Sequence, residues 1–259
     1  MSRKSEVARR RFLSHWLPGA GALLLAGCDR LSGNPHFREL LSLGEKASLA
    51  VQRAVVPRKA MAQEFSEADL SPGFRSNGTS RPANPEWEAL ARTGFSDWSL
   101  TVDGLVAHPR RYSLAQLRAL PARTQITRHD CVEGWSAIGK WTGVPLARIL
   151  QQVAPTAAAR YLVFYCADPM ENDPASLYYE SIDMDDAWHP QTILAYGLND
   201  EPLPIKNGAP LRLRVERQLG YKHAKYLMRI ELVESLAGIR GGKGGYWEDS
   251  NGYQWYAGI

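Results

Sequence analysis

The sequence predicts an α+β fold in which mixed sheets carry a few short helices. Short runs rich in β-branched and aromatic residues, such as residues 161–166 (YLVFYC), alternate with turns that contain Gly or Pro. Helical patterns are few, and no regular strand–helix–strand rhythm is present. The chain has 259 residues, 44% of them hydrophobic, which is enough for one sizeable core and marginal for two.

Residues 1–27 have the features of an export signal. Residues 9–13 (RRRFL) fit the twin-arginine pattern, and the apolar stretch 16–27 is too short to span a bilayer but suits a signal peptide. We therefore expect a twin-arginine signal peptide, export by the twin-arginine machinery and a periplasmic protein. Because this pathway carries folded proteins, a cofactor inserted in the cytoplasm is also indicated. A short anchor on the membrane surface is the alternative.

Cys28 ends the sequence LAGC (residues 25–28), which matches a lipobox. In a lipobox the cysteine is acylated and becomes the first residue of the mature chain, so a lipidated Cys28 would anchor the protein to the membrane. A plain signal peptide that is cleaved nearby is the alternative.

The net charge of +4 originates in the export signal. Residues 1–27 contain five basic residues and one acidic residue, so the remaining chain has 26 of each. This balance gives no indication of a nucleic-acid partner, and we expect none.

Residues 28–63 are predicted to form a tether with one helix, and residues 64–259 to form the folded domain. Apolar residues recur loosely between Phe37 and Val51, and Pro57 ends the pattern. Residues 71–85 are rich in Ser, Pro, Gly and Asn and are expected to be a loop.

Further elements are predicted within the domain. Residues 100–106 indicate a strand broken by an Asp-Gly turn, and residues 226–233 indicate another strand. Residues 145–153 predict a helix, because Pro145 lies in the first turn and Pro155 follows the end. Residues 211–216 (LRLRVE) alternate strictly, so one face of this strand should pack and the other should be polar.

Cys131 lies among charged residues in the stretch 126–136 (ITRHDCVEGWS). A thiolate persists only near positive charge or a metal; Arg128 and His129 would supply charge, while Asp130 opposes it. Three interpretations remain from the residues alone. Cys131 is a nucleophile paired with a histidine, a soft metal ligand supplemented by a cofactor, or half of a Cys131–Cys166 disulfide, the default in an oxidising compartment.

Four ordered motifs resemble the sulfite oxidase superfamily of molybdopterin-dependent oxidoreductases. They are residues 131–146 (CVEGWSAIGKWTGVPL), 187–190 (AWHP), 207–212 (NGAPLR) and 220–225 (GYKHAK). The branch with the strongest resemblance is the periplasmic methionine sulfoxide reductase catalytic subunit. The resemblance covers roughly residues 70 to 235.

This resemblance implies the sulfite-oxidase-type molybdopterin-binding fold and a molybdenum–molybdopterin cofactor, with molybdenum favoured over tungsten. The metal would be held by two pyranopterin sulfurs and by the Cys131 thiolate, which is then also the catalytic residue. Residues that match cofactor-contacting positions of the family are Arg75, Ser76, Asn77, Cys166, Asn207, Arg212, His223, Ala224 and Lys225. Cys166 is expected to be a small residue packed near the pterin and not a second ligand.

Two departures from the family stand out. The reductase branch usually has Met-Arg before the cysteine, where this chain has His129-Asp130, so an acid would replace a base beside the metal. The chain ends at Ile259 without a C-terminal immunoglobulin-like dimerisation domain, and we expect a monomer.

The C-terminal region contains a glycine-rich stretch and a cluster of aromatic residues. Residues 241–245 (GGKGG) lack the spacing of a Walker loop and are expected to form a flexible turn. The aromatic residues between 246 and 256 are expected to pack over the core, with a lining for a substrate funnel as the alternative.

The predicted function is a two-electron oxygen-atom transfer on a small oxo substrate such as a sulfoxide or sulfite. The sequence has no haem or iron–sulfur motif, so a separate membrane cytochrome b or periplasmic cytochrome c is expected to exchange the electrons. Two alternatives remain open: a non-catalytic binding or assembly protein that keeps the fold, and a structural lipoprotein stapled by a disulfide.

Overall fold

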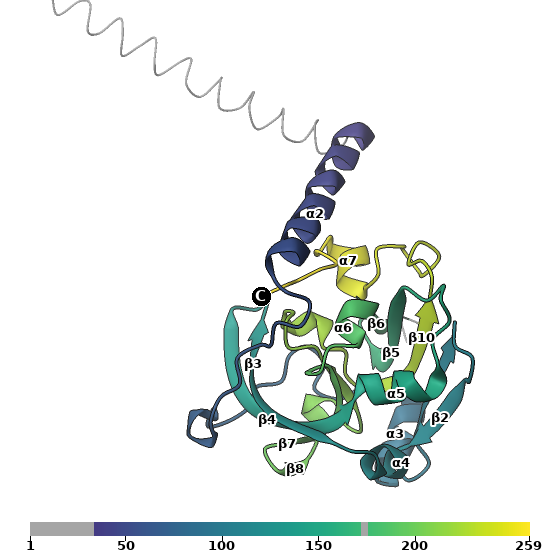
Figure 1. The fold of residues 1–259 in the computed structure, drawn as a ribbon. Helices are drawn as coiled ribbons and strands as arrows, with labels where there is room; N and C mark the ends of the chain where they lie inside the picture. Colours follow the sequence, from purple (N-terminus) through teal and green to yellow (C-terminus); the bar gives the residue numbers. More distant parts are fainter. Residues whose placement is uncertain (1–33, 172–175) are drawn as a thin grey trace, which may run out of the picture. The chain divides into compact units, whose positions relative to one another are not determined.

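The computed structural model describes residues 34–171 and 176–259, which form two units. In the first unit, α2 (Pro35–Val55) is the helix that the sequence predicts within residues 28–63 (Figure 1). The export signal and Cys28 lie outside the described residues. Among the helices of residues 34–171 and 176–259, none combines the length and the apolar content needed to cross a membrane.

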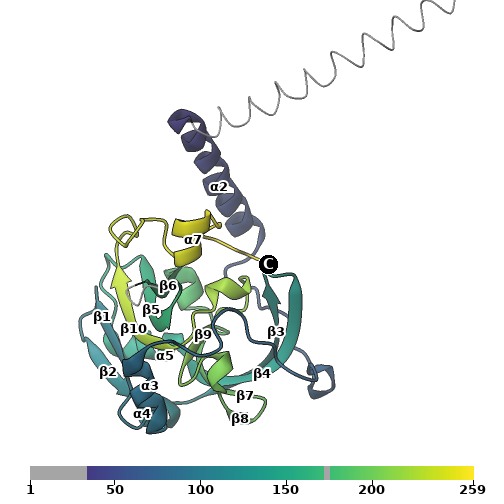
Figure 2. The ribbon, with the colours of Figure 1, turned by 180° about the vertical axis from the view of Figure 1, so that it is seen from behind.

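The second unit, residues 56–259, contains two five-stranded sheets (Figures 1 and 2). The first sheet has the order β2-β1-β10-β5-β6, with β1 and β10 parallel and the other pairs antiparallel. The second sheet has the order β3-β4-β7-β8, and β9 also pairs with β7. The strands are β1 (Ser99–Gly104), β2 (Arg110–Ser113), β3 (Arg123–Cys131), β4 (Trp135–Pro145), β5 (Tyr161–Pro169), β6 (Leu177–Asp183), β7 (Ile193–Leu198), β8 (Glu201–Pro202), β9 (Arg212–Arg214) and β10 (Leu227–Val233).

Short helices connect these strands. They are α3 (Pro85–Arg92), α4 (Leu114–Ala119), α5 (Leu146–Val153), α6 (Met184–Ala187), α7 (Tyr246–Asn251) and the 3₁₀ turns η1 (Glu67–Asp69), η2 (Ile205–Asn207) and η3 (Gly220–Lys222). Their ends follow local chemistry. The Asn84 side chain caps α3 by accepting from the amides of Glu86 and Trp87, and Pro85 occupies the first turn.

The main core joins α5 and α4 to strands of both sheets, among them β1 and β10 of the first and β4, β7 and β9 of the second. Ile149, Leu150 and Val153 of α5 are fully buried in the same core cluster as the strand residues Leu100 and Ile230. Burial of each such side chain stabilises the fold by about 1.5–3 kcal/mol. A smaller cluster around Phe74 and Trp141 fills the second sheet, so the α+β prediction is confirmed.

The structure differs from the sequence-based elements in three places. The strand predicted at residues 211–216 is reduced to β9, and its polar side chains are buried: Arg212 and Arg214 are both 0% exposed. Residues 57–63, assigned to the tether, bond to the folded unit, since Gln191 exchanges two hydrogen bonds with the backbone of Ala62. In the glycine-rich turn, Gly244 and Gly245 are buried, so this turn is packed in place.

Candidate functional site

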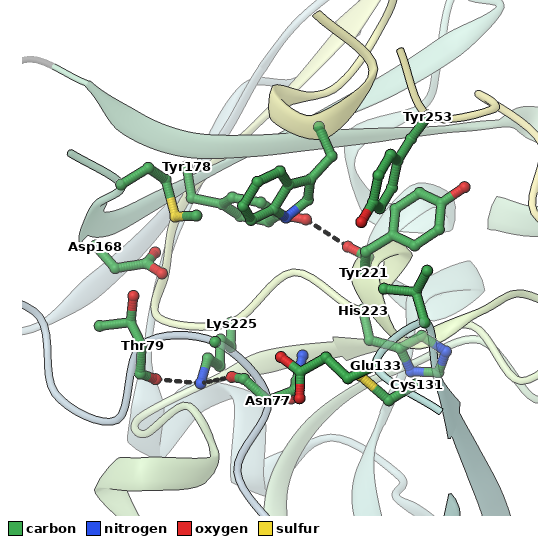
Figure 3. A pocket seen from close by; sticks show the side chains of 14 residues that line it. Asn77, Thr79, Cys131, Glu133, Asp168, Tyr178, Tyr221, His223, Lys225 and Tyr253 are labelled. Carbon is green, nitrogen blue, oxygen red and sulfur yellow. Dashed lines mark hydrogen bonds between the residues drawn. The ribbon is translucent and has the colours of Figure 1, made fainter. Parts of the chain in front are cut away.

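An open cavity with an empty volume of about 690 Å³ lies where the ends of β3 and β5 meet η3 and the C-terminal segment (Figure 3). The residues that line it are Asn77, Gly78, Thr79, Cys131, Val132, Glu133, Asp168, Met170, Tyr178, Tyr221, His223, Lys225, Trp247 and Tyr253.

Cys131 is the last residue of β3, and its thiol faces the cavity. Burial raises the pKa of Cys131, and the backbone amide of Glu133 partly offsets this effect by bonding to the sulfur. The thiolate therefore needs a positive partner. Cys131 and Cys166 both have free thiols, and Cys166 is packed in the main core instead of lining the cavity, so the disulfide that the residues alone allowed is absent.

Because strand side chains alternate between faces, His129 points to the same side of β3 as Cys131. His129 Nδ1 accepts a hydrogen bond of 2.8 Å from Arg214. Burial, followed by the nearby charge of His223, lowers the pKa of His129 well below its ordinary value, so the ring is neutral. A side chain at Gly220 would lie 2.5 Å from His129 Nε2, which explains the glycine at this position.

Asp130 points to the opposite face of β3 from Cys131. Its carboxylate pairs with Arg128 at 2.9 Å and accepts from Ser136. The expectation that an acid replaces a base beside the metal is therefore wrong, because the two-residue period of the strand places Asp130 outside the cavity.

We expect Asp130→Asn to leave steady-state turnover within about twofold of the unchanged protein, because Asp130 does not line the cavity and its ion pair is partly exposed. Measuring kcat and KM for a reducible sulfoxide checks this. A loss of turnover near that of a Cys131 variant would contradict the outward placement of Asp130.

A group of buried cations lies behind the cavity. Arg212 and Arg214 stack over Trp141, with 5.1 and 4.4 Å between each guanidinium and the ring centroid. Arg214 is neutralised by Glu216, whereas Arg212 donates to the backbone carbonyls of Asn207 and His223. Burial and Arg214 lower the pKa of Arg212 to about 9. Arg212 thus places a positive charge that no carboxylate pairs with behind the cavity, in a place that water reaches poorly, which favours an anionic group nearby.

Lys225 extends this positive charge to the cavity surface. Its ammonium donates to the backbone oxygens of Asn77 and Thr79 (Figure 3). Burial, together with Arg212, lowers the pKa of Lys225 to about 7. An anion bound at this position would restore the charge of Lys225.

The predicted cofactor-contacting residues fall into two groups. Asn77, His223 and Lys225 line the cavity with Cys131. The others do not line it: Ser76 bonds to the carbonyl of Lys206 and Arg75 stacks over Trp135, while Cys166, Asn207, Arg212 and Ala224 are buried behind the wall. An isolated bridge between Arg212 and Lys225 brings two of the four sequence motifs together.

Several buried polar atoms of this region have no partner within the protein. They include Asn77 Oδ1, His129 Nε2, Trp141 Nε1, Asp168 Oδ1, Asn207 Nδ2, Arg212 Nε and His223 Nδ1. Because an unpaired buried donor or acceptor costs about 1–3 kcal/mol, so many within one region indicate a polar ligand. A pterin with a terminal phosphate offers both the donors and the acceptors that these atoms require, so the residues present fit this group.

We expect Lys225 to contribute stability to the cofactor-free protein that increases as the pH rises from about 7 to about 9. The folded-state pKa of Lys225, about 7, lies below its ordinary value of 10.5, so the unfolded chain binds more protons across this interval. Thermal unfolding over a pH series measures the effect. Lys225→Met should flatten this rise, and an unchanged slope in that variant would contradict the assignment.

Residues that sequence reasoning missed complete the cavity. Asp168, whose pKa is raised to about 6 by burial, lies beside Thr79, and Tyr178 and Tyr221 form part of the far wall (Figure 3). Tyr246 and Trp247 pack against the main core, as expected for the C-terminal aromatic residues. Trp247 and Tyr253 also line the cavity, which agrees with the alternative expectation. Among the described residues, no group of three His, Cys, Asp or Glu side chains has the arrangement of a metal site.

The site agrees with comparisons to known proteins. Residues 88–237 match the family described as oxidoreductase molybdopterin binding domain. A protein of Azospira oryzae, provisionally named protein-methionine-sulfoxide reductase subunit YedZ1, is 36% identical over 97% of this chain and 88% of its own length.

Further relatives match over shorter stretches. The protein-methionine-sulfoxide reductase catalytic subunit MsrP of Xanthomonas campestris pv. campestris is 42% identical, and that of Ralstonia nicotianae is 35% identical. These matches cover 55% and 66% of this chain, and 47% and 53% of the relatives, so they span about half the length of the two reductases. The sulfane dehydrogenase SoxCD of Paracoccus pantotrophus is 22% identical with a TM-score of 0.49, over 54% of this chain and 39% of that one.

The family match covers more than half of the chain, and the Azospira relative aligns with nearly all of it. The fold is accordingly the sulfite-oxidase-type molybdopterin-binding fold, and the cofactor is a molybdopterin. The chain belongs to the oxidoreductase molybdopterin-binding domain family and is a molybdopterin-dependent oxidoreductase of the sulfite oxidase superfamily.

Proposed function

We propose that this protein reduces sulfoxides to thioethers. In this reaction the S–O bond breaks, the substrate takes up two electrons and two protons, and the oxygen leaves as water. The observation that carries the proposal is the Cys131 thiol, which faces a cavity with the buried cations Lys225 in its lining and Arg212 behind it. The names of relatives that align with this chain, methionine-sulfoxide reductase subunits, support the same reaction.

Cys131 would hold the metal, molybdenum in preference to tungsten, because a soft thiolate suits this element. When bound, the cofactor supplies two-electron oxygen-atom transfer. The protein supplies a fixed ligand at the end of a paired strand, which keeps the thiol in one position. The charges of Arg75 and Arg212 favour the thiolate and so oppose the effect of burial, which raises the pKa of Cys131.

Three cavity residues would orient the pterin. His223 Nε2 donates to the carbonyl of Gln218, so its Nδ1 is left as an acceptor, and Asn77 offers its unpaired Oδ1. Lys225 would bind the phosphate end through its ammonium, with the backbone at Ala224 alongside.

The predicted residues that do not line the cavity would either bind the pterin or support the residues that bind it. Asn207 Nδ2 and Arg212 Nε are the unpaired donors among them, and we assign both to the pterin. Arg75 and Ser76 would hold the loop that carries Asn77, while Cys166 would pack beneath the pterin without binding the metal.

The electrons would come from a separate cytochrome, either a membrane cytochrome b or a periplasmic cytochrome c. We also propose a periplasmic location after twin-arginine export, with lipidated Cys28 as an anchor. A cytochrome of that compartment would then be within reach. Both proposals rest on sequence patterns alone, and a mature N-terminus identified by mass spectrometry checks the second.

A substrate screen of the cofactor-loaded protein tests the proposed function. Reduced viologen serves as the electron donor, with sulfoxides, N-oxides and sulfite as candidate substrates, and cofactor-free protein as the control. We expect sulfoxide-dependent oxidation of the dye that requires the cofactor. Turnover of N-oxides or sulfite with no reaction of any sulfoxide would refute the proposal.

A further inference from the structure

The side of the cavity that faces away from Lys225 and Asn77 is aromatic (Figure 3). We call Tyr178, Tyr221, Trp247 and Tyr253 the aromatic wall. Tyr221 and Tyr253 meet edge to face with 5.1 Å between ring centroids, and Trp247 stacks on Tyr253 at 5.8 Å. Met170 lines the cavity as well.

The hydroxyl groups of two wall residues are occupied by the protein. Tyr178 donates to the carbonyl of Tyr221, and Tyr221 donates to the carbonyl of Gln254 at 2.6 Å. Their rings, and not their hydroxyls, are therefore what these residues offer to a ligand. These bonds also join the wall into one unit, since Gln254 directly follows Tyr253.

The segment that carries Trp247 and Tyr253 is fixed to the body of the protein. Glu248, next to Trp247, is fully buried and pairs with the buried Lys222 at 2.8 Å. Asp249 accepts from the amides of Gly241 and Lys243 at 2.8 and 2.9 Å. The wall is consequently a preorganised surface, which reduces the entropy lost when a ligand binds.

The two sides of the cavity differ in what they demand of a ligand. Among the described residues that line it, the buried polar atoms without a partner belong to Asn77, Asp168 and His223. This polar side suits the pterin. The aromatic wall suits an apolar or sulfur-containing group, because sulfur packs favourably against ring edges and the negative ring faces disfavour anions.

We propose that the aromatic wall binds the substrate and selects neutral sulfoxides that carry an apolar substituent, with Trp247 and Tyr253 as the specificity-determining residues. This inference rests on the proposed sulfoxide reduction for its substrate class. It assigns to the C-terminal segment a role in substrate recognition beyond covering the core.

The test combines equilibrium binding with turnover. Methyl phenyl sulfoxide carries a large apolar substituent, whereas dimethyl sulfoxide carries two methyl groups. For Trp247→Leu in the cofactor-loaded protein, we expect the Kd of methyl phenyl sulfoxide to rise about tenfold and that of dimethyl sulfoxide to change much less. KM should follow Kd, with kcat and metal content nearly unchanged.

Trp255→Leu is the matched control. It removes an indole from the same segment, but Trp255 packs on Tyr161 and donates to Ser181 instead of lining the cavity. It should leave the Kd of methyl phenyl sulfoxide unchanged. Trp247→Phe should retain most of the affinity, because an aromatic face remains.

The outcomes separate this inference from the proposed function. If Trp247→Leu and the unchanged protein bind methyl phenyl sulfoxide with equal affinity, the aromatic wall does not bind the substrate. Turnover of sulfoxides would still support the proposed sulfoxide reduction. If binding depends on Trp247 but no sulfoxide is turned over, the aromatic wall binds sulfoxides and the proposed sulfoxide reduction is refuted. If the unchanged protein does not bind methyl phenyl sulfoxide, the proposed role of the aromatic wall is refuted.

Discussion

Cys131→Ser is expected to lower kcat for sulfoxide reduction by at least about 10³-fold, because removal of a group on which the chemistry depends has effects of this order. Serine is nearly isosteric, but its hydroxyl is a hard and weakly acidic donor that suits molybdenum poorly. The variant should also retain less metal during purification. Steady-state kinetics and metal analysis on the same sample measure both effects.

Cys166→Ser is the matched control for this substitution. Cys166 is 1% exposed and belongs to the main core, so its replacement should reduce stability while the metal content stays near one per chain. Circular dichroism would confirm that Cys131→Ser keeps the fold. Equal losses of metal in the two variants would show that Cys131 has no special role.

Lys222→Met is expected to lower the free energy of unfolding by about 3–5 kcal/mol, the usual effect of breaking a buried ion pair. Lys222, Glu180 and Glu248 are all 0% exposed, and the lysine pairs with both carboxylates. Without the ammonium, the buried carboxyl groups of Glu180 and Glu248 would face each other with no cation between them. Chemical denaturation at neutral pH gives the value.

The pH dependence of this loss has a defined sign. The pKa of Glu180 is already raised well above its ordinary value, first by burial, and removing Lys222 would raise it further. A carboxyl with a raised folded-state pKa is stabilising below its unfolded pKa and loses that contribution as the pH rises. The deficit of Lys222→Met should therefore grow as the pH rises through the folded-state pKa of Glu180 in the unchanged protein, because only above that pH do the two folded proteins bind different numbers of protons.

Lys140→Met is the control for Lys222→Met. Lys140 also pairs with two carboxylates, those of Glu67 and Asp200, but these partners are 63% and 67% exposed. Exposed pairs contribute little to stability because water and salt screen them. Similar losses in the two variants would contradict the distinction between buried and exposed pairs.

Local patterns in the sequence predicted many of the elements. Residues 145–153 were predicted as a helix, and α5 begins one residue later because Pro145 is its cap. Residues 161–166 were predicted as a buried strand, and β5 continues to Pro169. These predictions succeeded because apolar periodicity and proline act within a few residues of the chain.

The orientation of polar side chains was harder to predict. The alternation in residues 211–216 suggested a solvent-facing polar side, yet Arg212 and Arg214 are buried because the rest of the site folds over them. Asp130 was placed beside the metal because it precedes Cys131 in the sequence, although neighbours on a strand face opposite ways. Counting in steps of two from Cys131 would have selected His129 instead.

Contacts between distant parts of the chain account for what was missed. The cavity joins Asp168, Tyr221 and Trp247, which share no motif. Lys222 bonds to Glu180 and Glu248, which lie 42 and 26 positions away in the sequence. Both tryptophans of the aromatic stretch 246–256 have a tyrosine beside them in the sequence, so only the tertiary structure shows that Trp247 lines the cavity and Trp255 does not.

X-ray absorption at the molybdenum edge tests the central claim, that the Cys131 sulfur coordinates the metal. Fitting the metal–sulfur shell counts the sulfur ligands in the cofactor-loaded protein and in Cys131→Ser. We expect three sulfur ligands in the first, two from the pterin and one from Cys131, and two in the variant. An identical sulfur count in both proteins would contradict the assignment of Cys131 as the metal ligand.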